Sequence, residues 1–392
     1  MKKLASFGTR DSNSATDDPS RGIGAARRWI LEEFRSYSPR LEVRYDPHPV
    51  TKSARVVRDL DIVNVIAVLP GTDLASVQVA VGAHYDSWCA VLKDGRVDAE
   101  ATAAAPLAPG VDDNASGVAA VMELARVLSQ YEFRKTLVFI AFAGEEQGLL
   151  GARGLAKKWK ADSQKLEAMI NLDTIGSIQS GNGFTSTHAV RVFSDEPMDS
   201  GSRSLARYIK QIGERYCPEM RIDPVFRRDR FGRGGDHTPF HTEGFAAVRM
   251  TTPAENLGVQ HTPNDTFEHS SSSLTARVAR VDASVVADLA LAPATPVLKP
   301  INRGLGGPAR GDRYDAVLRW EPAQDDKITS YRVLIRSTLS PFWEREIDIG
   351  NVSEFTLKDF SIDDVVIGIQ AQGAGGVESL ASVYQAAPFR IQ

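Results

Sequence analysis

Apolar and polar residues follow two alternating periods along the first three quarters of the chain. Short apolar runs, typical of strands covered on both faces, occupy residues 77–83, 137–143, 168–172 and 246–250. Apolar residues at helical spacing occupy residues 22–37, 117–128, 151–159, 205–215 and 278–291. Residues 61–69 alternate in period two and end at a Pro-Gly turn. This succession predicts an α/β domain with a mostly parallel central sheet flanked by helices.

The pattern changes after residue 292. Residues 293–311 are rich in proline and glycine, which is typical of a linker. From residue 312 onward, apolar and polar residues alternate in several short segments, which predicts a small all-β sandwich. We therefore expect a first domain at residues 1–292, a linker at 293–311 and a sandwich at 312–392.

Composition and charge exclude several classes of protein. The 392 residues are 42% hydrophobic and 24% charged, as in soluble globular proteins. A formal net charge of −4 is unlike the basic surface of a nucleic-acid-binding protein. No apolar run approaches the roughly 20 residues that a membrane-spanning helix requires. Only Cys89 and Cys217 are present, so one disulfide is possible, and cysteine content leaves the compartment open.

Residues that can bind a metal ion follow the predicted strands at their carboxyl ends. They are His84 and Asp86 after the first buried strand, Glu145 and Glu146 after the second, Asp173 after the third, His261 after the fourth, and Asp112 just before a helix. In open α/β sheets, ligands bind beyond the carboxyl ends of the strands. We therefore expect these side chains to lie together.

Several carboxylates at one edge of a sheet would repel one another, and a divalent cation removes that penalty. Imidazole and carboxylate ligands together suit zinc. Each residue alone has an ordinary interpretation: Asp112 or Asp113 could cap the following helix, His84 could be a buried histidine, and Glu145 and Glu146 could form a solvated turn. Their occurrence at successive strand ends favours a metal site.

The motifs around these residues resemble those of the dizinc aminopeptidase family, which includes bacterial leucyl aminopeptidases and glutamate-carboxypeptidase-like enzymes. The resemblance covers residues 61–291. The motifs, in the order of that family, are His-Tyr-Asp-Ser, Gly-Val-Asp-Asp-Asn-Ala-Ser-Gly, Phe-Ala-Gly-Glu-Glu-Gln-Gly-Leu-Leu-Gly, Asn-Leu-Asp, Gly-Asp-His-Thr-Pro-Phe and His-Thr-Pro-Asn-Asp-Thr. It implies a zinc exopeptidase fold with two bound Zn²⁺ ions.

The resemblance also implies a set of metal ligands. Asp112 would bridge the two ions. His84 and Glu146 would complete one site, and Asp173 and His261 would complete the other.

Two further residues take catalytic roles in this resemblance. Asp86 would orient His84. Glu145 would accept a proton from the water that bridges the metals and pass it to the leaving amine. The expected activity is removal of N-terminal residues from a peptide substrate.

Two alternatives remain open at this stage. A carboxypeptidase or dipeptidase would need a basic residue facing the carboxylate of the substrate, and Arg233 and Arg249 are candidates. An inactive, peptidase-like binding protein would have lost these residue types, which this chain retains. His237 is interpreted as a structural residue or as one that supports a metal ligand, since five ligands are already found.

The C-terminal segment resembles a fibronectin type III-like sandwich, on the basis of Trp320 and the apolar run from Tyr331. Such a domain could pack against the catalytic domain or tether the protein to a surface. Residues 4–10 resemble a segment that family members carry after an export signal. We therefore expect a secreted or periplasmic protein, with a cytoplasmic location as the alternative.

Overall fold

The computed structural model divides the chain into two compact units, Met1–Ala290 and Leu291–Gln392. The structure describes residues 1–103, 107–195, 197, 199–229, 234–299, 315–322 and 325–384. Most of the predicted linker, from residue 300 onward, lies outside these residues.

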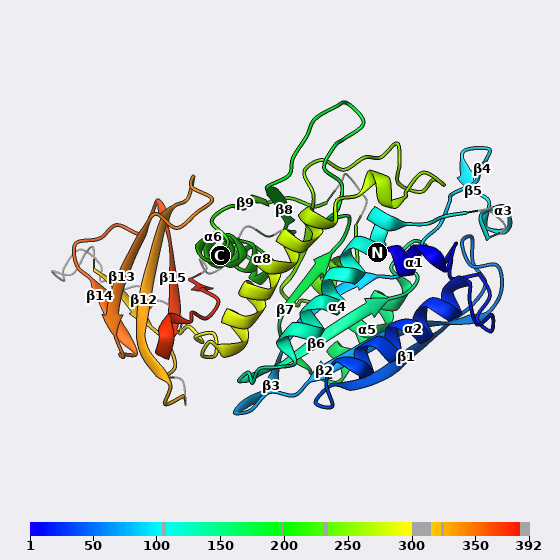
Figure 1. The fold of residues 1–392 in the computed structure, drawn as a ribbon. Coiled ribbons are helices and arrows are strands. Elements are labelled where there is room, and N and C mark those ends of the chain that lie inside the picture. Colours follow the sequence, from blue (N-terminus) through cyan, green and yellow to red (C-terminus); the bar gives the residue numbers. More distant parts are fainter. Residues whose placement is uncertain are drawn as a thin grey trace, which may run out of the picture. The chain divides into compact units, whose positions relative to one another are not determined.

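Unit 1 is built on a mixed sheet of eight strands among the described residues (Figure 1). Its order is β1-β2-β6-β3-β7-β10-β8-β9. The strands are β1 (Glu42–Val50), β2 (Leu60–Leu69), β3 (Leu74–His84), β6 (Lys135–Phe142), β7 (Lys165–Leu172), β8 (Ala189–Phe193), β9 (Arg221–Val225) and β10 (Ala247–Thr251). The central strands β6, β3, β7 and β10 run parallel, so their carboxyl ends share one edge of the sheet.

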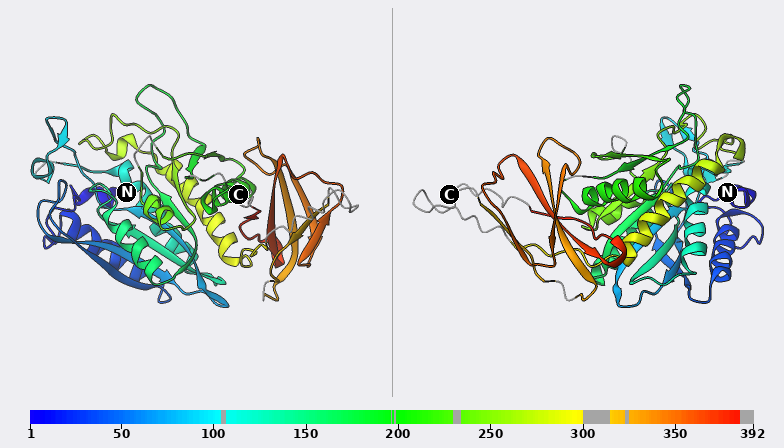
Figure 2. Two further views of the ribbon diagram at one scale, coloured as in Figure 1. Left: turned by 180° about the vertical axis from the view of Figure 1, so that it is seen from behind. Right: turned by 60° about the vertical axis from the view of Figure 1, so that its left-hand side comes forward.

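Helices cover both faces of this sheet (Figure 2). On one face, α2 (Gly22–Tyr37) and α4 (Ser116–Leu128) contact each other and the sheet. On the other face, α5 (Leu150–Ala161) and α7 (His237–Thr242) contact each other, and Phe240 packs against Trp159 and Phe142. Further helices of the unit are α1 (Lys2–Ser6), α3 (Ala99–Ala103), α6 (Gly201–Tyr216) and α8 (Ser272–Leu291). The predicted α/β class is confirmed.

The strands that the hydrophobic pattern does not predict lie towards the two ends of the sheet. β1 is largely exposed and contains two prolines, which are tolerated on an edge strand because one side of it needs no backbone donors. β8 and β9 are five residues each. A small hairpin, β4 (Leu92–Lys93) and β5 (Arg96–Val97), precedes α3.

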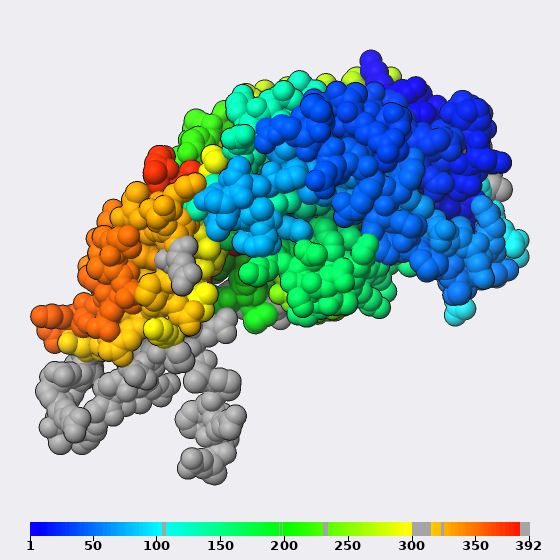
Figure 3. All heavy atoms as spheres, turned by 90° about the horizontal axis from the view of Figure 1, so that it is seen from below, coloured from blue at the N-terminus to red at the C-terminus, as the bar shows by residue number. Residues whose placement is uncertain are grey.

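The N-terminal residues are an integral part of unit 1. Leu4 is fully buried and Phe7 packs against Trp29 of α2, with 6.0 Å between ring centroids. Figure 3 shows the first residues, in dark blue, packed against the blue segments that follow.

The described residues of unit 2 form two small antiparallel sheets. One pairs β11 (Ala316–Arg319) with β14 (Glu354–Leu357), and the other has the order β13 (Arg345–Gly350), β12 (Ile328–Ser337), β15 (Val365–Gly373), β16 (Ser382–Val383). Trp320 and Tyr331 lie in its core, with 5.2 Å between ring centroids. The more specific fibronectin type III-like assignment stays a prediction.

Membrane-spanning helices and disulfides were the remaining structural questions that the sequence raised. Among the described helices, we find none with both the length and the apolar character needed to cross a membrane. Cys89 and Cys217 are both free thiols rather than a disulfide.

Candidate metal centre

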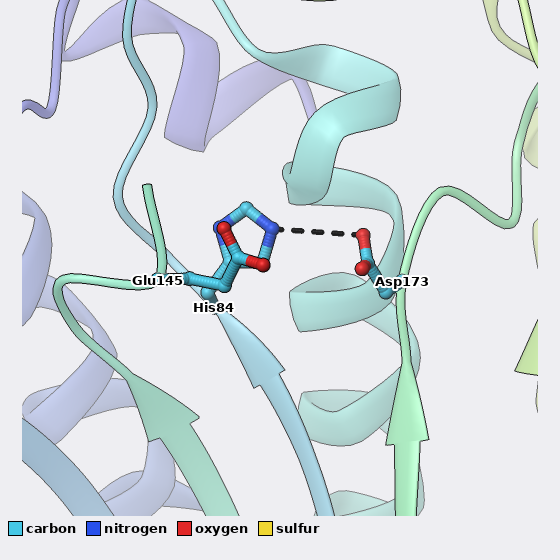
Figure 4. A group of neighbouring side chains, drawn as sticks. All are labelled: His84, Glu145 and Asp173. Carbon is cyan, nitrogen blue, oxygen red and sulfur yellow. Dashed lines mark ion pairs between the residues drawn. The ribbon is translucent and has the colours of Figure 1, made fainter. Parts of the chain in front are cut away.

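Most of the predicted site residues meet at the carboxyl edge of the central strands. His84 is the last residue of β3, Asp173 directly follows β7, and Glu145 and Glu146 lie in the turn after β6. Figure 4 shows His84, Glu145 and Asp173 approaching one another from these three strand ends. His261 reaches the same place from the loop after β10, where its backbone is left-handed with φ of 58°. The parallel strands therefore collect residues that are far apart in the sequence.

One carboxylate, that of Asp113, lies between the two histidines. Its Oδ1 is 3.2 Å from Nε2 of His84, and its Oδ2 is 3.0 Å from Nε2 of His261. Nε2 of His84 is also 3.6 Å from Oδ1 of Asp173, and Nε2 of His261 is 3.2 Å from Oε2 of Glu146. The result is two groups, each with one imidazole and two carboxylates, that share Asp113.

The prediction that Asp112 occupies this shared position is wrong. Oδ1 of Asp112 instead accepts a hydrogen bond from the backbone N–H of Gly176, at 2.8 Å. The segment Val111–Ala115 is interrupted by non-helical dihedral angles at Asp113 and Asn114. Asp113 therefore departs from the helical conformation of the segment, and its side chain faces the histidines while that of Asp112 contacts Gly176.

The ion-pair contacts group the other ligand candidates differently from the prediction, although ligand atoms of His84, Asp113 and Glu146 also lie within 4.8 Å of one another. His84 lies with Asp173, and His261 lies with Glu146. β3 is a parallel neighbour of both β7 and β6, so strand order alone would allow His84 to pair with Asp173 or with Glu146. Glu146 lies in the turn after β6 and meets the loop that carries His261. Neighbouring strands and loops, rather than order in the sequence, therefore decide which residues pair.

Asp86 holds the turn that carries the two glutamates. Its carboxylate accepts hydrogen bonds from the backbone N–H groups of Glu145, at 3.3 Å, and Glu146, at 3.1 Å. Nδ1 of His84 lies 3.2 Å from the carbonyl oxygen of Asp86 and 3.7 Å from its carboxylate. A single residue thus contacts the far nitrogen of His84 and the neighbouring turn.

Asp265 holds the loop that carries Asp113. Its two carboxylate oxygens accept hydrogen bonds from the backbone N–H groups of Asp112, at 2.8 Å, and Asp113, at 3.0 Å. Asp265 lies in the His-Thr-Pro-Asn-Asp-Thr motif but is not among the site residues predicted from the sequence. Asn114 connects the same loop to the end of β7, because its side-chain amide donates to the carbonyl of Leu172 at 2.8 Å.

Arg249 holds the carboxylate of Asp173 by a hydrogen bond. Its side chain is fully buried and donates to the carboxylates of Asp173, at 2.9 Å, Asp229, at 3.2 Å, and Glu255, at 3.1 Å, and to the hydroxyl of Thr174, at 2.9 Å. Burial opposes the charge, but these carboxylates raise the pKa of Arg249 well above its usual range. Arg249 is therefore a permanent cation that neutralises part of the acidic cluster.

Trp88 and Arg55 pack beside His261. Trp88 meets the ring of His261 edge to face, with 5.6 Å between centroids, and the guanidinium of Arg55 lies 5.3 Å from the centre of the Trp88 ring. Arg55 also donates to the carbonyl of Glu146 at 3.1 Å. His237 is fully buried and is not part of the two groups around Asp113.

The electrostatics of the cluster favour a cation. Burial raises the pKa of Glu145 well above its usual range, and the carboxylates of Glu146 and Asp236 act in the same direction. Burial likewise raises the pKa of Glu146, to about 7. Carboxylates this close together repel one another when ionised, and a bound dication removes that repulsion.

The donor atoms fit zinc. Two ligands about 2.0–2.2 Å from one tetrahedral zinc ion lie about 3.3–3.6 Å apart. The imidazole–carboxylate distances here are 3.0, 3.2, 3.2 and 3.6 Å, close to that range. Oε1 of Glu146 is buried and has no hydrogen-bond partner within the described part of the chain, which leaves it available as a ligand atom. Mixed imidazole and carboxylate donors also suit zinc chemically.

Comparison with known sequences finds zinc peptidases. A model described as Peptidase family M28 matches residues 64–286. The chain is similar to a probable zinc metalloprotease of Pyrenophora tritici-repentis, with 34% identity over 97% of this chain and 92% of that protein. It is also similar to a probable zinc metalloprotease of Phaeosphaeria nodorum, with 33% identity over 97% of this chain and 83% of that protein.

Comparison with solved structures identifies the same fold. LapA aminopeptidase of Legionella pneumophila matches with a TM-score of 0.54 and 20% identity, over 74% of this chain and 70% of that chain. A glutaminyl cyclase of Porphyromonas gingivalis matches with a TM-score of 0.55 and 18% identity, over 73% of this chain and 94% of that chain. At these identities the likeness concerns the fold alone.

Proposed function

This chain belongs to peptidase family M28 and is a zinc-dependent peptidase, and from that premise we propose that it is an aminopeptidase which holds two zinc ions. One observation carries the proposal: the carboxylate of Asp113 lies between His84 and His261, with a further carboxylate beside each histidine. A carboxylate shared in this way would hold two ions close together, as the chemistry of two-metal hydrolases needs.

The proposed ligand sets follow from these distances. His84, Asp113 and Asp173 would hold one ion, and His261, Asp113 and Glu146 would hold the other. Each set contains three protein ligands, which leaves coordination positions for water and substrate. When bound, zinc would act as a Lewis acid that polarises the scissile carbonyl.

Glu145 is the proposed general base. An oxygen of its carboxylate lies within 4.8 Å of ligand atoms of His84 and Asp173, so it faces the reacting region. It would accept a proton from the attacking water and deliver it to the nitrogen of the leaving peptide as the peptide bond breaks. The hydrogen bond from its backbone N–H to Asp86 holds the turn in which it lies.

The position of Arg249 favours an aminopeptidase over a carboxypeptidase or dipeptidase. Those alternatives need a basic side chain that faces the substrate carboxylate. Arg249 is fully buried and already contacts three carboxylates, so it offers no group to the substrate. The other candidate, Arg233, lies outside the described residues.

The experiment compares amino-acyl anilides with their N-acetylated forms, using protein of known zinc content. We expect the zinc-loaded protein to cleave only the free-amine substrates. Replacing Glu145 by Gln should leave zinc content unchanged and reduce turnover by about 10²–10⁴-fold, because only the proton transfer is lost. Glu123→Gln, on the exposed face of α4, is the matched control.

Three results would contradict parts of the proposal. Cleavage of N-acetylated peptides from the carboxyl end would identify a carboxypeptidase. Bound zinc without turnover of any peptide would support a binding protein. Full activity of the Glu145→Gln protein would show that Glu145 is not the base.

A secreted or periplasmic location remains part of the proposal, and fractionation of the native host tests it.

A further inference from the structure

Arg10 is a fully buried arginine in the segment of residues 7–21 that joins α1 to α2. We call this segment the N-terminal arm. Its guanidinium donates to backbone carbonyls rather than to carboxylates. Nε donates to Tyr85 at 2.7 Å, Nη1 donates to Pro109 at 2.7 Å and to Leu4 at 3.1 Å, and Nη2 donates to Gly110 at 3.0 Å. A planar guanidinium can reach several acceptors at once, which an ammonium group on a flexible stem cannot do.

Two of these carbonyls belong to segments that carry the proposed metal ligands. Tyr85 lies between His84, a proposed ligand, and Asp86. Gly110 begins the loop that carries Asp113. The guanidinium therefore joins the segment of one ligand to the segment of the ligand shared by both ions.

Backbone and hydroxyl contacts of the arm strengthen the same connection. Ser87 accepts a hydrogen bond from the backbone N–H of Arg10, at 3.2 Å, and donates to the carbonyl of Ala108, at 2.8 Å. The hydroxyl of Thr9 accepts a hydrogen bond from the N–H of Ala108, at 3.0 Å. The arm thus holds the residues after β3 and those before Asp113 in one network.

The packing around Gly110 is tight. Gly110 has φ of 50°, and a Cβ atom at this position would lie 2.9 Å from Nη2 of Arg10 and 2.5 Å from Cβ of Ser87. The loop can pass between these two side chains only because glycine has no Cβ. Burial of the Arg10 charge is costly unless its hydrogen bonds are made, so the guanidinium holds the carbonyls of Tyr85 and Gly110 in place. Without the guanidinium, the loop that carries Asp113 could move.

We propose that Arg10 is a positioning residue, and that the N-terminal arm sets the spacing between His84 and Asp113 and so the geometry of the metal centre. This inference rests on the proposed function, since it assigns Arg10 to the same two-metal site. Arg10 contacts neither substrate nor metal in this scheme and acts through the carbonyls of Tyr85 and Gly110.

The test compares Arg10→Met with Arg134→Met in the full chain. Arg134 is also largely buried in unit 1 but pairs with Asp73 at the amino end of β6, away from the metal edge. Each protein is loaded with zinc for kinetics and with Co²⁺ for visible absorption spectra and for the rate of metal release to a chelator.

We expect Arg10→Met to lower kcat by about 10–100-fold with KM changed less than about threefold, because misplaced ligands weaken catalysis more than ground-state binding. Its Co²⁺ spectrum should change and its metal release should accelerate by about 10-fold or more. Arg134→Met should lose thermal stability while it keeps the wild-type kcat and spectrum.

A wild-type kcat and an unchanged Co²⁺ spectrum in Arg10→Met would overturn the inference. If that protein does not fold, Arg10→Lys decides by the same measurements, because it keeps the charge but not the fork of donors. A wild-type protein that binds Co²⁺ but cleaves no peptide would contradict the proposed function instead. The spectra and release rates then still test Arg10.

Discussion

Adjacent aspartates provide the sharpest test of the metal centre. Asp112 and Asp113 occupy neighbouring positions, are both buried, and both donate their backbone N–H groups to Asp265. Only Asp113 lies against the two histidines. Asp113→Asn and Asp112→Asn make the same chemical change one residue apart, so each controls for the other.

The expected magnitudes differ because the two carboxylates have different partners. Asp113→Asn would remove a negative charge that faces both proposed dications. The attraction between two unit charges about 4 Å apart is about 4 kcal/mol even at an effective dielectric constant of 20. Loss of at least that amount weakens metal binding about 10³-fold. Asp112→Asn keeps an oxygen that can accept the hydrogen bond from Gly176 and should cost about 1–2 kcal/mol of stability.

The assay is zinc content after exhaustive gel filtration, measured by mass spectrometry, followed by turnover of an amino-acyl anilide. Asp113→Asn should lose most of its zinc and its activity. Asp112→Asn should retain both within a few-fold of wild type. If Asp112→Asn loses zinc while Asp113→Asn keeps it, the assignment of the bridging ligand from these distances is wrong.

Two further predictions concern buried charges of unit 1. Arg249→Met removes the cation that Asp173, Asp229 and Glu255 share, which should lower the stability of the zinc-loaded protein by about 3–5 kcal/mol in calorimetry; an unchanged unfolding temperature would contradict this. Asp282 of α8 is fully buried without a hydrogen-bond partner in the described part of the chain, and burial raises its pKa to about 8. In the unfolded chain this carboxyl titrates near its ordinary value of about 4, so Asp282 should reduce stability progressively as the pH rises from about 4 to about 8. Asp282→Asn cannot ionise, and its gain in melting temperature over wild type should grow between pH 5 and pH 8; parallel curves would refute the assignment.

Much of unit 1 follows from the sequence because its central strands are buried on both faces. Such strands are continuous apolar runs, and the helices between them show a clear apolar face. β1 gives a weaker signal, since it is exposed and contains prolines. β8 and β9 are too short to establish a periodicity. Exposed or short strands form because neighbouring strands offer them hydrogen bonds, which is a property of the assembled sheet.

The sequence alone determined which residue types gather at the carboxyl edge, because parallel strands place their ends together regardless of separation along the chain. Only the tertiary structure decided that Asp113 rather than Asp112 faces the histidines, since local dihedral angles select between adjacent side chains. Tertiary structure alone also brought Arg10 and Asp265 to the site. Their contacts are hydrogen bonds to backbone groups of distant segments, and a backbone group carries no side-chain signature in the sequence.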